Sequence, residues 1–524
     1  MTRFVTAAEV RLDLIARREI ALLDLREEDP YARGHPLFAA NLPLSRLELE
    51  AYERLPRRDV TIVLYDDGEG LTAPAAERLE ALGYNQIRVL ARGLAGWVAA
   101  GHELFQDVNS ASKAFGELVE ARRHTPSLPA AEAKALIDAR ANVVVLDARR
   151  FDEFRTMSIP TGVSVPGAEL VLRARALAPD PTTTVIVNCA GRTRSLIGAQ
   201  SLINAGLPNR VFALRNGSIG WTLAGQSLEH GQTRRYGEPG VAWEGEARAK
   251  AREVAYRAGV NRLGPADLAI LKADHTRTLY LFDVRQPDEF EAGHLPGFIN
   301  APGGQLVQET DHAAPVRGAR IVLSDPRSVR ADMTASWLAQ MGWEVYVLDA
   351  PEAAFNETGP ALRCQPPPPA TILIGAEALA ARIERNVVTV IDLGPSPARR
   401  RGHIPGSWFA VRARLASGLG DLKTCWPLVL ASPDDRMARF AAPEVARLTG
   451  QAPLVLEGGT SAWAAAGLAL ETGLGRAITA VDDVYRRPYE GTDNAPAAMQ
   501  AYLDWEYGLV DQLARDGTHG FHVI

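Results

Sequence analysis

Short apolar runs and helix-like stretches alternate four times along the chain. Each unit opens with an apolar run that ends in aspartate, continues with a second apolar run, and then has a helical stretch that ends at glycine. Continuous apolar strands that alternate with helices are typical of a parallel sheet covered on both faces. The first strands are predicted at residues 21–24, 143–147, 279–283 and 388–392, and the second at 61–64, 185–188, 321–324 and 428–431.

A third apolar run in each unit leads into a motif that ends in an aromatic residue. Three copies read Gly-x-x-x-Trp and end at Trp97, Trp221 and Trp463, whereas the third copy is degraded and ends at Phe355. The units recur about every 120 residues. The pattern therefore predicts an α/β protein of four tandem domains, each with a small parallel sheet and helices on both faces.

Domain boundaries follow from the repeat and from local composition. Residues 242–258 favour a helix that connects the second unit to the third. The proline run at 366–369 is typical of a stiff linker. For the aromatic-rich end of the chain we favour a strap packed on the protein over an arm that binds a partner. The predicted divisions are 1–108, 109–238, 239–365, 366–475 and a tail at 476–524.

Composition narrows the class of function. The net charge of -6 gives no sequence-wide basic excess, so nucleic-acid binding is not expected. No apolar window is long enough to span a membrane and no signal peptide is recognisable at the start, so we expect a cytoplasmic protein without membrane contact. The three cysteines form no CxxC pair and the histidines no ligand-spaced cluster. We therefore expect no disulfide framework, no metal and no cofactor.

The third unit carries a longer recognisable segment. The run from Asp283 to Asn300 reads DVRQPDEFEAGHLPGFIN. It resembles the N-terminal signature of the rhodanese homology domain, and the Gly-x-x-x-Trp motifs resemble its C-terminal signature. Weaker copies follow the first strands of the first and fourth units. The resemblance implies a tandem rhodanese-like protein of the sulfurtransferase family.

In that family the catalytic cysteine directly follows the central strand and opens a loop into a helix. Cys189 alone fits this position, in the second unit. The corresponding residue is Asp66 in the first unit and Asp325 in the third, and in the fourth it is Ser432 or Pro433 by two different counts. The resemblance thus implies one catalytic domain and three inactive ones.

The residues after Cys189 suit a sulfur carrier. A cysteine attacks as its thiolate, so its pKa of about 8.5 should be lowered by main-chain N–H groups, by the following helix N-terminus and by nearby cations. We expect Arg192 and Arg194 to supply that charge and to bind an anionic donor. The other predicted loop and substrate-binding residues are Ala190, Gly191, Thr193 and Ser195.

Supporting residues are predicted around this loop. Asp147 and Arg149, in the family's Asp-x-Arg position, should form a buried ion pair that fixes the end of the first strand. Asn216 and Gly217 should border the pocket, with Trp221 in the core. For the other two cysteines, Cys364 and Cys425, we expect no catalytic role.

The predicted reaction is a double displacement. Cys189 takes the outer sulfur of a donor such as thiosulfate, and a nucleophilic acceptor, a thiol or cyanide, removes it. One alternative is a relay or scaffold that passes a persulfide to a partner protein. A phosphatase of the same fold is disfavoured, because the six-residue Cys-x4-Arg loop is one residue shorter than a phosphate loop. The physiological donor and acceptor stay open, as does a homo-oligomeric state.

Overall fold

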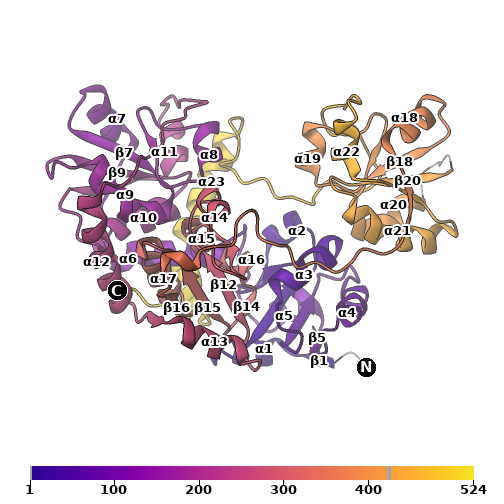
Figure 1. The fold of residues 1–524 in the computed structure, drawn as a ribbon, viewed down its shortest axis with the longest axis horizontal. Coiled ribbons are helices and arrows are strands. Elements are labelled where there is room, and N and C mark those ends of the chain that lie inside the picture. The colour runs from indigo at the N-terminus through magenta and orange to yellow at the C-terminus, as the bar shows by residue number, and fades with distance from the viewer. Residues whose placement is uncertain (1–2, 421, 423–425) are drawn as a thin grey trace.

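Four sheets organise the computed structural model, which describes residues 3–420, 422 and 426–524 (Figure 1). Within each sheet the strands of one repeat pair in parallel, and the strand predicted second along the chain lies at the centre. This confirms the predicted tandem α/β fold, while the domain boundaries by residue number stay predictions. In spatial order the strands are β1 (Arg3–Val5), β5 (Ile87–Leu90), β4 (Ile62–Tyr65), β2 (Ile20–Asp24) and β3 (Ala40–Asn41); β6 (Ser127–Leu128), β10 (Val211–Leu214), β9 (Thr184–Asn188), β7 (Val143–Asp147) and β8 (Val163–Ser164); β11 (Asn261–Leu263), β16 (Glu344–Leu348), β15 (Arg320–Ser324), β12 (Leu279–Asp283) and β13 (Ile299–Asn300); and β17 (Ile372–Ile374), β21 (Leu454–Leu456), β20 (Leu428–Ala431), β18 (Thr389–Asp392), β19 (Trp408–Phe409) and β22 (Arg476–Ala477).

Helices connect these strands and pack on the sheets. The central strands are buried on both faces, as expected of parallel sheets covered by helices, whereas the edge strands β1 and β17 are partly exposed. The connector predicted at 242–258 is a helix, α12. In chain order the helices are α1 (Ala7–Ile15), α2 (Glu28–Arg33), α3 (Leu47–Arg54), α4 (Thr72–Ala81), α5 (Gly93–Ala99), α6 (Ser110–Arg123), α7 (Ala130–Asp138), α8 (Phe151–Thr156), α9 (Leu170–Leu177), α10 (Thr193–Asn204), α11 (Gly217–Leu223), α12 (Val241–Arg257), α13 (Pro265–Ala273), α14 (Pro287–Ala292), α15 (Gly303–Gln308), α16 (Thr310–Ala313), α17 (Val329–Gln340), α18 (Ala376–Glu384), α19 (Ser396–Arg401), α20 (Leu415–Gly420), α21 (Arg436–Thr449), α22 (Gly459–Ala465), α23 (Pro496–Tyr507) and α24 (Leu509–Asp516).

The third repeat departs from the others in two ways. A short extra strand, β14 (Val316–Arg317), leaves its own repeat and pairs antiparallel with β2 of the first sheet. The degraded aromatic motif forms only a 3₁₀ turn, η3 (Glu352–Ala354), where the other repeats have α5, α11 or α22. The first and third repeats are therefore joined through a shared sheet, which the sequence pattern did not indicate.

The fourth repeat packs on the first repeat and stands apart from the second and third, and extended segments join it to the rest of the chain (Figure 1). It meets the first repeat through Arg412, whose guanidinium donates to both carboxylate oxygens of Glu48 at 2.8 and 2.9 Å. Among the described residues, no helix has the length and apolar character needed to cross a membrane.

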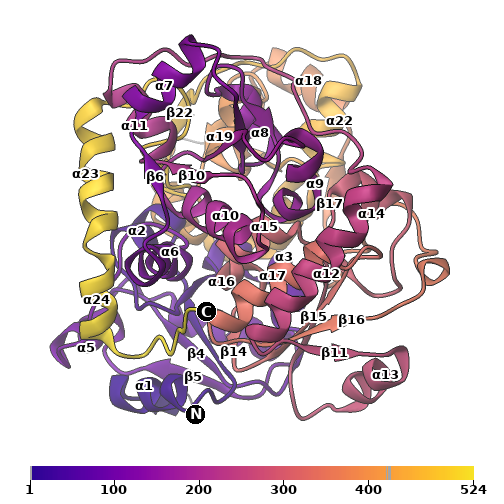
Figure 2. The ribbon, with the colours of Figure 1, turned by 90° about the vertical axis from the view of Figure 1, so that its left-hand side faces the viewer.

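The C-terminal tail returns from the fourth repeat to the other three. Figure 2 shows α23 and α24 running end to end along one side of the molecule, beside α6 and α11. Tyr489 and Tyr502 are buried, and the Phe521 ring lies 5.4 Å from that of Phe115 on α6. The tail is thus a packed strap, the arrangement favoured from its sequence.

Candidate active site

Cys189 directly follows the central strand β9 of the second sheet and is 2% exposed. Residues 189–192 form a tight loop that enters α10 at Thr193. The carbonyl oxygen of Cys189 accepts hydrogen bonds from the amide of Ser218, at 2.9 Å, and from its hydroxyl, at 3.2 Å. The start of α11 therefore holds the sulfur-bearing residue at the carboxyl end of the sheet.

The register of strand pairing identifies the residue of the fourth repeat that corresponds to Cys189. In the second sheet Asp147 pairs with Asn188, the residue before Cys189, and in the fourth Asp392 pairs with Ala431, the residue before Ser432. The amide of Thr460 donates to the Ser432 carbonyl at 2.9 Å, as Ser218 does to Cys189. The position equivalent to Cys189 in the fourth repeat is therefore Ser432 and not Pro433.

The loop presents a row of unused main-chain donors. Within the described residues, the N–H groups of residues 190–194 donate to no oxygen acceptor. Successive loop N–H groups without acceptors can form a nest for an anion, and the N-terminus of α10 adds partial positive charge. The Ser195 hydroxyl lies 3.5 Å from the Cys189 sulfur and donates to the Arg192 carbonyl at 2.7 Å. The loop thus combines main-chain donors that have no acceptor with a hydroxyl close to the sulfur.

The pKa of the free Cys189 thiol is shifted in the direction opposite to our expectation. Burial raises the pKa of the Cys189 thiol above its ordinary value. Arg194 and the hydroxyl and amide of Ser195 act in the opposite direction but do not outweigh burial. The prediction of a lowered pKa is therefore wrong for this structure. Removing the thiolate from water costs more free energy than these groups regain by stabilising it.

Arg194 is the cation that acts on the thiol. Its guanidinium donates to both carboxylate oxygens of Glu153 on α8, at 2.7 and 2.8 Å. Burial alone would raise the pKa of Glu153, but Arg194 and the neighbouring Arg149 and Arg150 hold that pKa at about 2. Glu153 is thus a permanent anion that fixes the direction of Arg194 beside the loop.

Arg192 points elsewhere, which corrects the prediction that it supports the thiolate. Its guanidinium donates to the carboxylate of Glu117 at 2.7 and 2.8 Å and also pairs with Glu120, both on α6. A further hydrogen bond of 2.8 Å reaches the hydroxyl of Tyr507 on α23. Arg192 therefore ties the active loop to α6 and to the C-terminal tail, and its charge is neutralised by carboxylates.

The Asp-x-Arg pair is a buried brace for the first strand. Both side chains are 1% exposed, and Arg149 donates to the two oxygens of Asp147 at 2.8 to 3.2 Å and to the Met157 carbonyl at 2.6 Å. The side chain of Asn188 donates to Asp147 at 2.8 Å. The pair has the structural geometry expected from the sequence, and it fixes the residue that precedes Cys189.

Position 217 requires glycine because the backbone of the Cys189 loop lies very close to it. Gly217 has a φ of +53°, and a Cβ atom at this position would lie 2.4 Å from the carbonyl oxygen of Cys189 and 2.6 Å from that of Gly191. The side chain of Asn216 accepts from Arg192 at 3.1 Å and from Tyr507 at 3.0 Å. Both residues border the loop, and their place at the substrate pocket stays a prediction, whereas Trp221 is buried in the core.

The C-terminal tail covers the outer face of the loop, which sequence reasoning missed. Ala190 and Ile219 form one apolar cluster with four tail residues, Tyr489, Met499, Tyr502 and Leu503. A Cβ atom on Gly191 would lie 3.1 Å from the Tyr502 ring. The repeat pattern could not reveal this cover, because the tail matches no repeat; its density of aromatic residues was the available signal.

A cleft of about 390 Å³ lies beside Arg194. Arg149 and Met157 line it from the second repeat, Glu28 from the first, Gln308 from the third and Arg487 from the tail. The three repeats without a cysteine at the equivalent position are therefore not equivalent to one another: the first and third build walls of this cleft.

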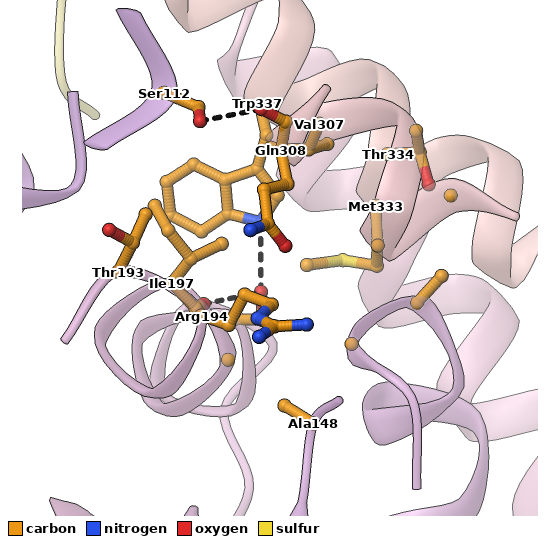
Figure 3. Close-up of a pocket in the computed structure, with 16 residues that line it drawn as sticks. Ser112, Ala148, Thr193, Arg194, Ile197, Val307, Gln308, Met333, Thr334 and Trp337 are labelled. Atoms are coloured by element: carbon orange, nitrogen blue, oxygen red, sulfur yellow. Dashed lines mark hydrogen bonds between the residues drawn. The ribbon is translucent and has the colours of Figure 1, made fainter. Parts of the chain in front are cut away.

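A smaller cavity of about 40 Å³ lies on the other side of Arg194, between α10 and the third repeat. Figure 3 shows Arg194 and Ile197 facing Met333 and Trp337 across it, with Gln308 at one edge. The side-chain oxygens of Thr193 and Gln308 are buried there without a hydrogen-bond partner among the described residues. The third repeat thus also surrounds the active loop.

The structure describes one of the other two cysteines. Cys364 is exposed next to the proline linker. Cys425 lies outside the described residues. The absence of a catalytic role for either one stays a prediction.

Comparison with known proteins gives matches over most of this architecture. The rhodanese-like domain model matches residues 6–100, 129–224 and 266–350, together more than half of the chain. The crystal structure of thiosulfate sulfurtransferase from Pseudomonas aeruginosa is 60% identical, with a TM-score of 0.98 and 100% coverage of both chains. The uncharacterized protein YibN of Escherichia coli K12 is 32% identical over 92 residues, which are 17% of this chain and 63% of that relative.

Proposed function

This chain belongs to the rhodanese-like domain family, and from that membership we propose that it is a sulfurtransferase in which Cys189 carries the transferred sulfur. The observation that carries the proposal is the loop itself. Cys189 opens a loop whose next five main-chain N–H groups donate to no acceptor among the described residues, and Arg194 is the cation that acts on its thiol. A persulfide is an anion of the size that such a nest accommodates.

In the first half-reaction the Cys189 thiolate attacks the outer sulfur of the donor, for which we propose thiosulfate. A sulfur–sulfur bond forms at Cys189 while the bond to the sulfonate sulfur breaks, and its electron pair leaves with sulfite. The loop N–H groups stabilise the terminal sulfur of the Cys189 persulfide as it gains negative charge. Arg194 draws the dianionic donor into the cleft and offsets the charge that develops there.

In the second half-reaction an acceptor nucleophile, a thiolate or cyanide, attacks the terminal sulfur of the persulfide. The bond between this sulfur and Cys189 breaks, and its electron pair restores the Cys189 thiolate. The same hydrogen-bond donors of the loop serve both half-reactions, because the resting thiolate and the persulfide are both anions. A carrier that must return to a free thiol suits a reducing compartment, so the proposal includes a cytoplasmic location.

The raised pKa of Cys189 affects the first step. At neutral pH the free thiol holds its proton in the closed structure, so a donor must find the minor thiolate population or stabilise it on binding. The Ser195 hydroxyl, now directed at the Arg192 carbonyl, is close enough to turn and donate to the thiolate. We propose Ser195 as the side-chain donor that stabilises the thiolate.

A small acceptor is favoured over a protein relay. Cys189 is 2% exposed and its loop is covered by the C-terminal tail, whereas the adjacent cleft has room for a small organic molecule. A partner protein would have to present its own cysteine through that cleft. The silent first and third repeats act as walls in this proposal.

Intact-protein mass spectrometry after exposure to thiosulfate tests the assignment. The wild-type protein should gain one sulfur atom and lose it on addition of a small thiol. Cys189→Ser should abolish both the gain and the turnover, and Cys364→Ser, at the exposed cysteine, should leave both intact. Sulfur uptake by the Cys189→Ser protein at the wild-type level would refute the proposal.

A further inference from the structure

Lys113 lies at the centre of a buried cluster that joins α6 to the tail. It is 2% exposed, and its ammonium nitrogen is 2.9 Å from the Asp107 carboxylate. The ring centroids of Tyr489, Tyr502 and Trp505 lie 5.6, 5.1 and 5.5 Å from that nitrogen. Such contacts attract a cation to the face of an aromatic ring, and they are strongest where water is excluded. One ammonium group therefore holds three aromatic residues of the tail.

These aromatic residues lie at two separate places in one tail segment, residues 484–507. Tyr489 precedes α23, whereas Tyr502 and Trp505 lie on it. A single attachment on α6 thus fixes the segment at two points that are more than a dozen residues apart in the chain. The cluster is a latch between the body of the protein and the segment.

The latched segment rests directly on the active loop. The Tyr502 ring and the Glu506 carboxylate approach Gly191 so closely that a Cβ atom there would be 3.1 and 3.3 Å from them. The hydroxyl of Tyr502 donates to Glu506 at 2.7 Å, which keeps both side chains against the loop. Access to the sulfur from the outer face is therefore closed.

The same segment also lines the cleft beside Arg194. Tyr489 and Gly491 line the 390 Å³ cleft beside Arg194 together with Met157. They also line a second cavity of about 180 Å³, on the side of Ile219. Tyr489 therefore lines both cavities, and the position of the segment sets the width of the cleft beside Arg194.

We infer that residues 484–507 form a specificity lid, held by Lys113, that limits Cys189 to sulfur donors and acceptors small enough to enter the cleft. The inference rests on the proposed function, since it assigns a substrate size to the same site. It names the excluded class as well: thiols carried on folded proteins or on bulky polymers. Lys113 acts as a positioning residue because it contacts the lid and not the reacting sulfur.

The test measures access to Cys189 by reagents of different size. In a Cys364→Ser, Cys425→Ser background Cys189 is the remaining thiol, and its alkylation is followed with iodoacetamide and with a maleimide carried on a polyethylene glycol chain. The wild-type lid should admit the small reagent and slow the bulky one. Tyr502→Ala should raise the bulky rate about tenfold or more while the small rate changes little, which corresponds to about 1.4 kcal/mol.

Lys113→Met tests the latch with little change in side-chain volume. It should also raise the bulky rate, and Lys113→Arg, which keeps the charge, should restore most of the closure. Tyr256→Ala, at an exposed tyrosine on α12, is the control and should change neither rate. Equal access of both reagents to the wild-type protein, or an unchanged ratio in Tyr502→Ala, would overturn the lid. An unchanged ratio in Lys113→Met alone would overturn the latch.

A second measurement separates this inference from the proposed function. The persulfide loaded from thiosulfate is offered a small thiol or the thiol of a folded protein. The wild-type protein should discharge to the small thiol, and Tyr502→Ala to both. If no persulfide forms while the alkylation ratio still responds to Tyr502→Ala, the proposed function fails and the lid stands.

Discussion

The guanidinium group of Arg194 and the carboxylate of Glu153 form a two-point ion pair, at 2.7 and 2.8 Å, beside the Cys189 thiol. Pairing with Glu153 determines how strongly Arg194 lowers the pKa of the Cys189 thiol. A fully neutralised cation would have little effect on the thiol, yet Arg194 lowers the thiol pKa against the effect of burial. The ion pair therefore positions Arg194 without cancelling its influence.

Arg194→Gln should raise the pKa of the Cys189 thiol further and slow sulfur loading near neutral pH about tenfold, because one pKa unit is a tenfold change in thiolate. The pH dependence of iodoacetamide alkylation measures this shift. In the wild-type protein the rate should already climb with pH beyond the usual cysteine range, since burial raises that pKa. Arg192→Gln is the matched control and should shift the profile much less. Equal shifts in the two variants would contradict the different roles assigned to the two arginines.

Arg192 should matter more for stability than for the thiol. Arg192→Ala leaves the buried Glu117 carboxylate without its cation, and breaking a buried pair in this way costs about 3–5 kcal/mol. Faster amide hydrogen exchange in α6 and at the start of α10 would report the loss. Glu120→Gln, which changes the more exposed partner, should cost less than about 1 kcal/mol. If Arg192→Ala left exchange in α6 unchanged, the structural role of Arg192 would be wrong.

Much of the fold and part of the site could be predicted from the sequence because the same pattern of strands occurs in each repeat. Each first strand ends in aspartate and each central strand is followed by the candidate position, so Cys189 could be located by counting. The partners of Arg192 could not be predicted in this way, because Glu117 lies about 75 residues earlier on a helix between two repeats. The lid had no counterpart in any repeat, and the raised thiol pKa depends on the burial that the lid helps to produce.

Glu506 should make stability depend on pH. Burial raises the pKa of its carboxyl group from 4.5 to about 8, so the folded protein keeps a proton that the unfolded chain releases. This contribution to stability is complete below about pH 4.5 and is lost as the pH rises through about 8. Glu506→Gln should therefore match the wild type at pH 5 and be more stable at pH 9, by on the order of a few kcal/mol. Thermal unfolding across this range is the measurement, with Asp504→Asn on the exposed side of α23 as the control.

A stability difference between Glu506→Gln and the wild type that stayed constant from pH 5 to 9 would contradict this account of Glu506. The variant also bears on the lid. An ionised Glu506 would place negative charge against the loop that holds the thiolate or persulfide, so the neutral form suits the closed lid. Alkylation of Cys189 by the bulky reagent should therefore increase with pH more steeply in the wild type than in Glu506→Gln.

Gly217 should tolerate no side chain. Gly217→Ala would place a methyl group 2.4 Å from the Cys189 carbonyl oxygen and force alanine into a left-handed backbone conformation. We expect a loss of about 3 kcal/mol or more in the stability of this repeat, together with a displaced loop and lost sulfur loading. Gly206→Ala is a matched control in the same repeat, because Gly206 has a φ of +70° but no atom within 4 Å of the added carbon. It should cost about 1–2 kcal/mol through backbone strain and leave loading intact. Loading that survived Gly217→Ala at the wild-type rate would show that the carbonyl of Cys189 need not be held at this distance.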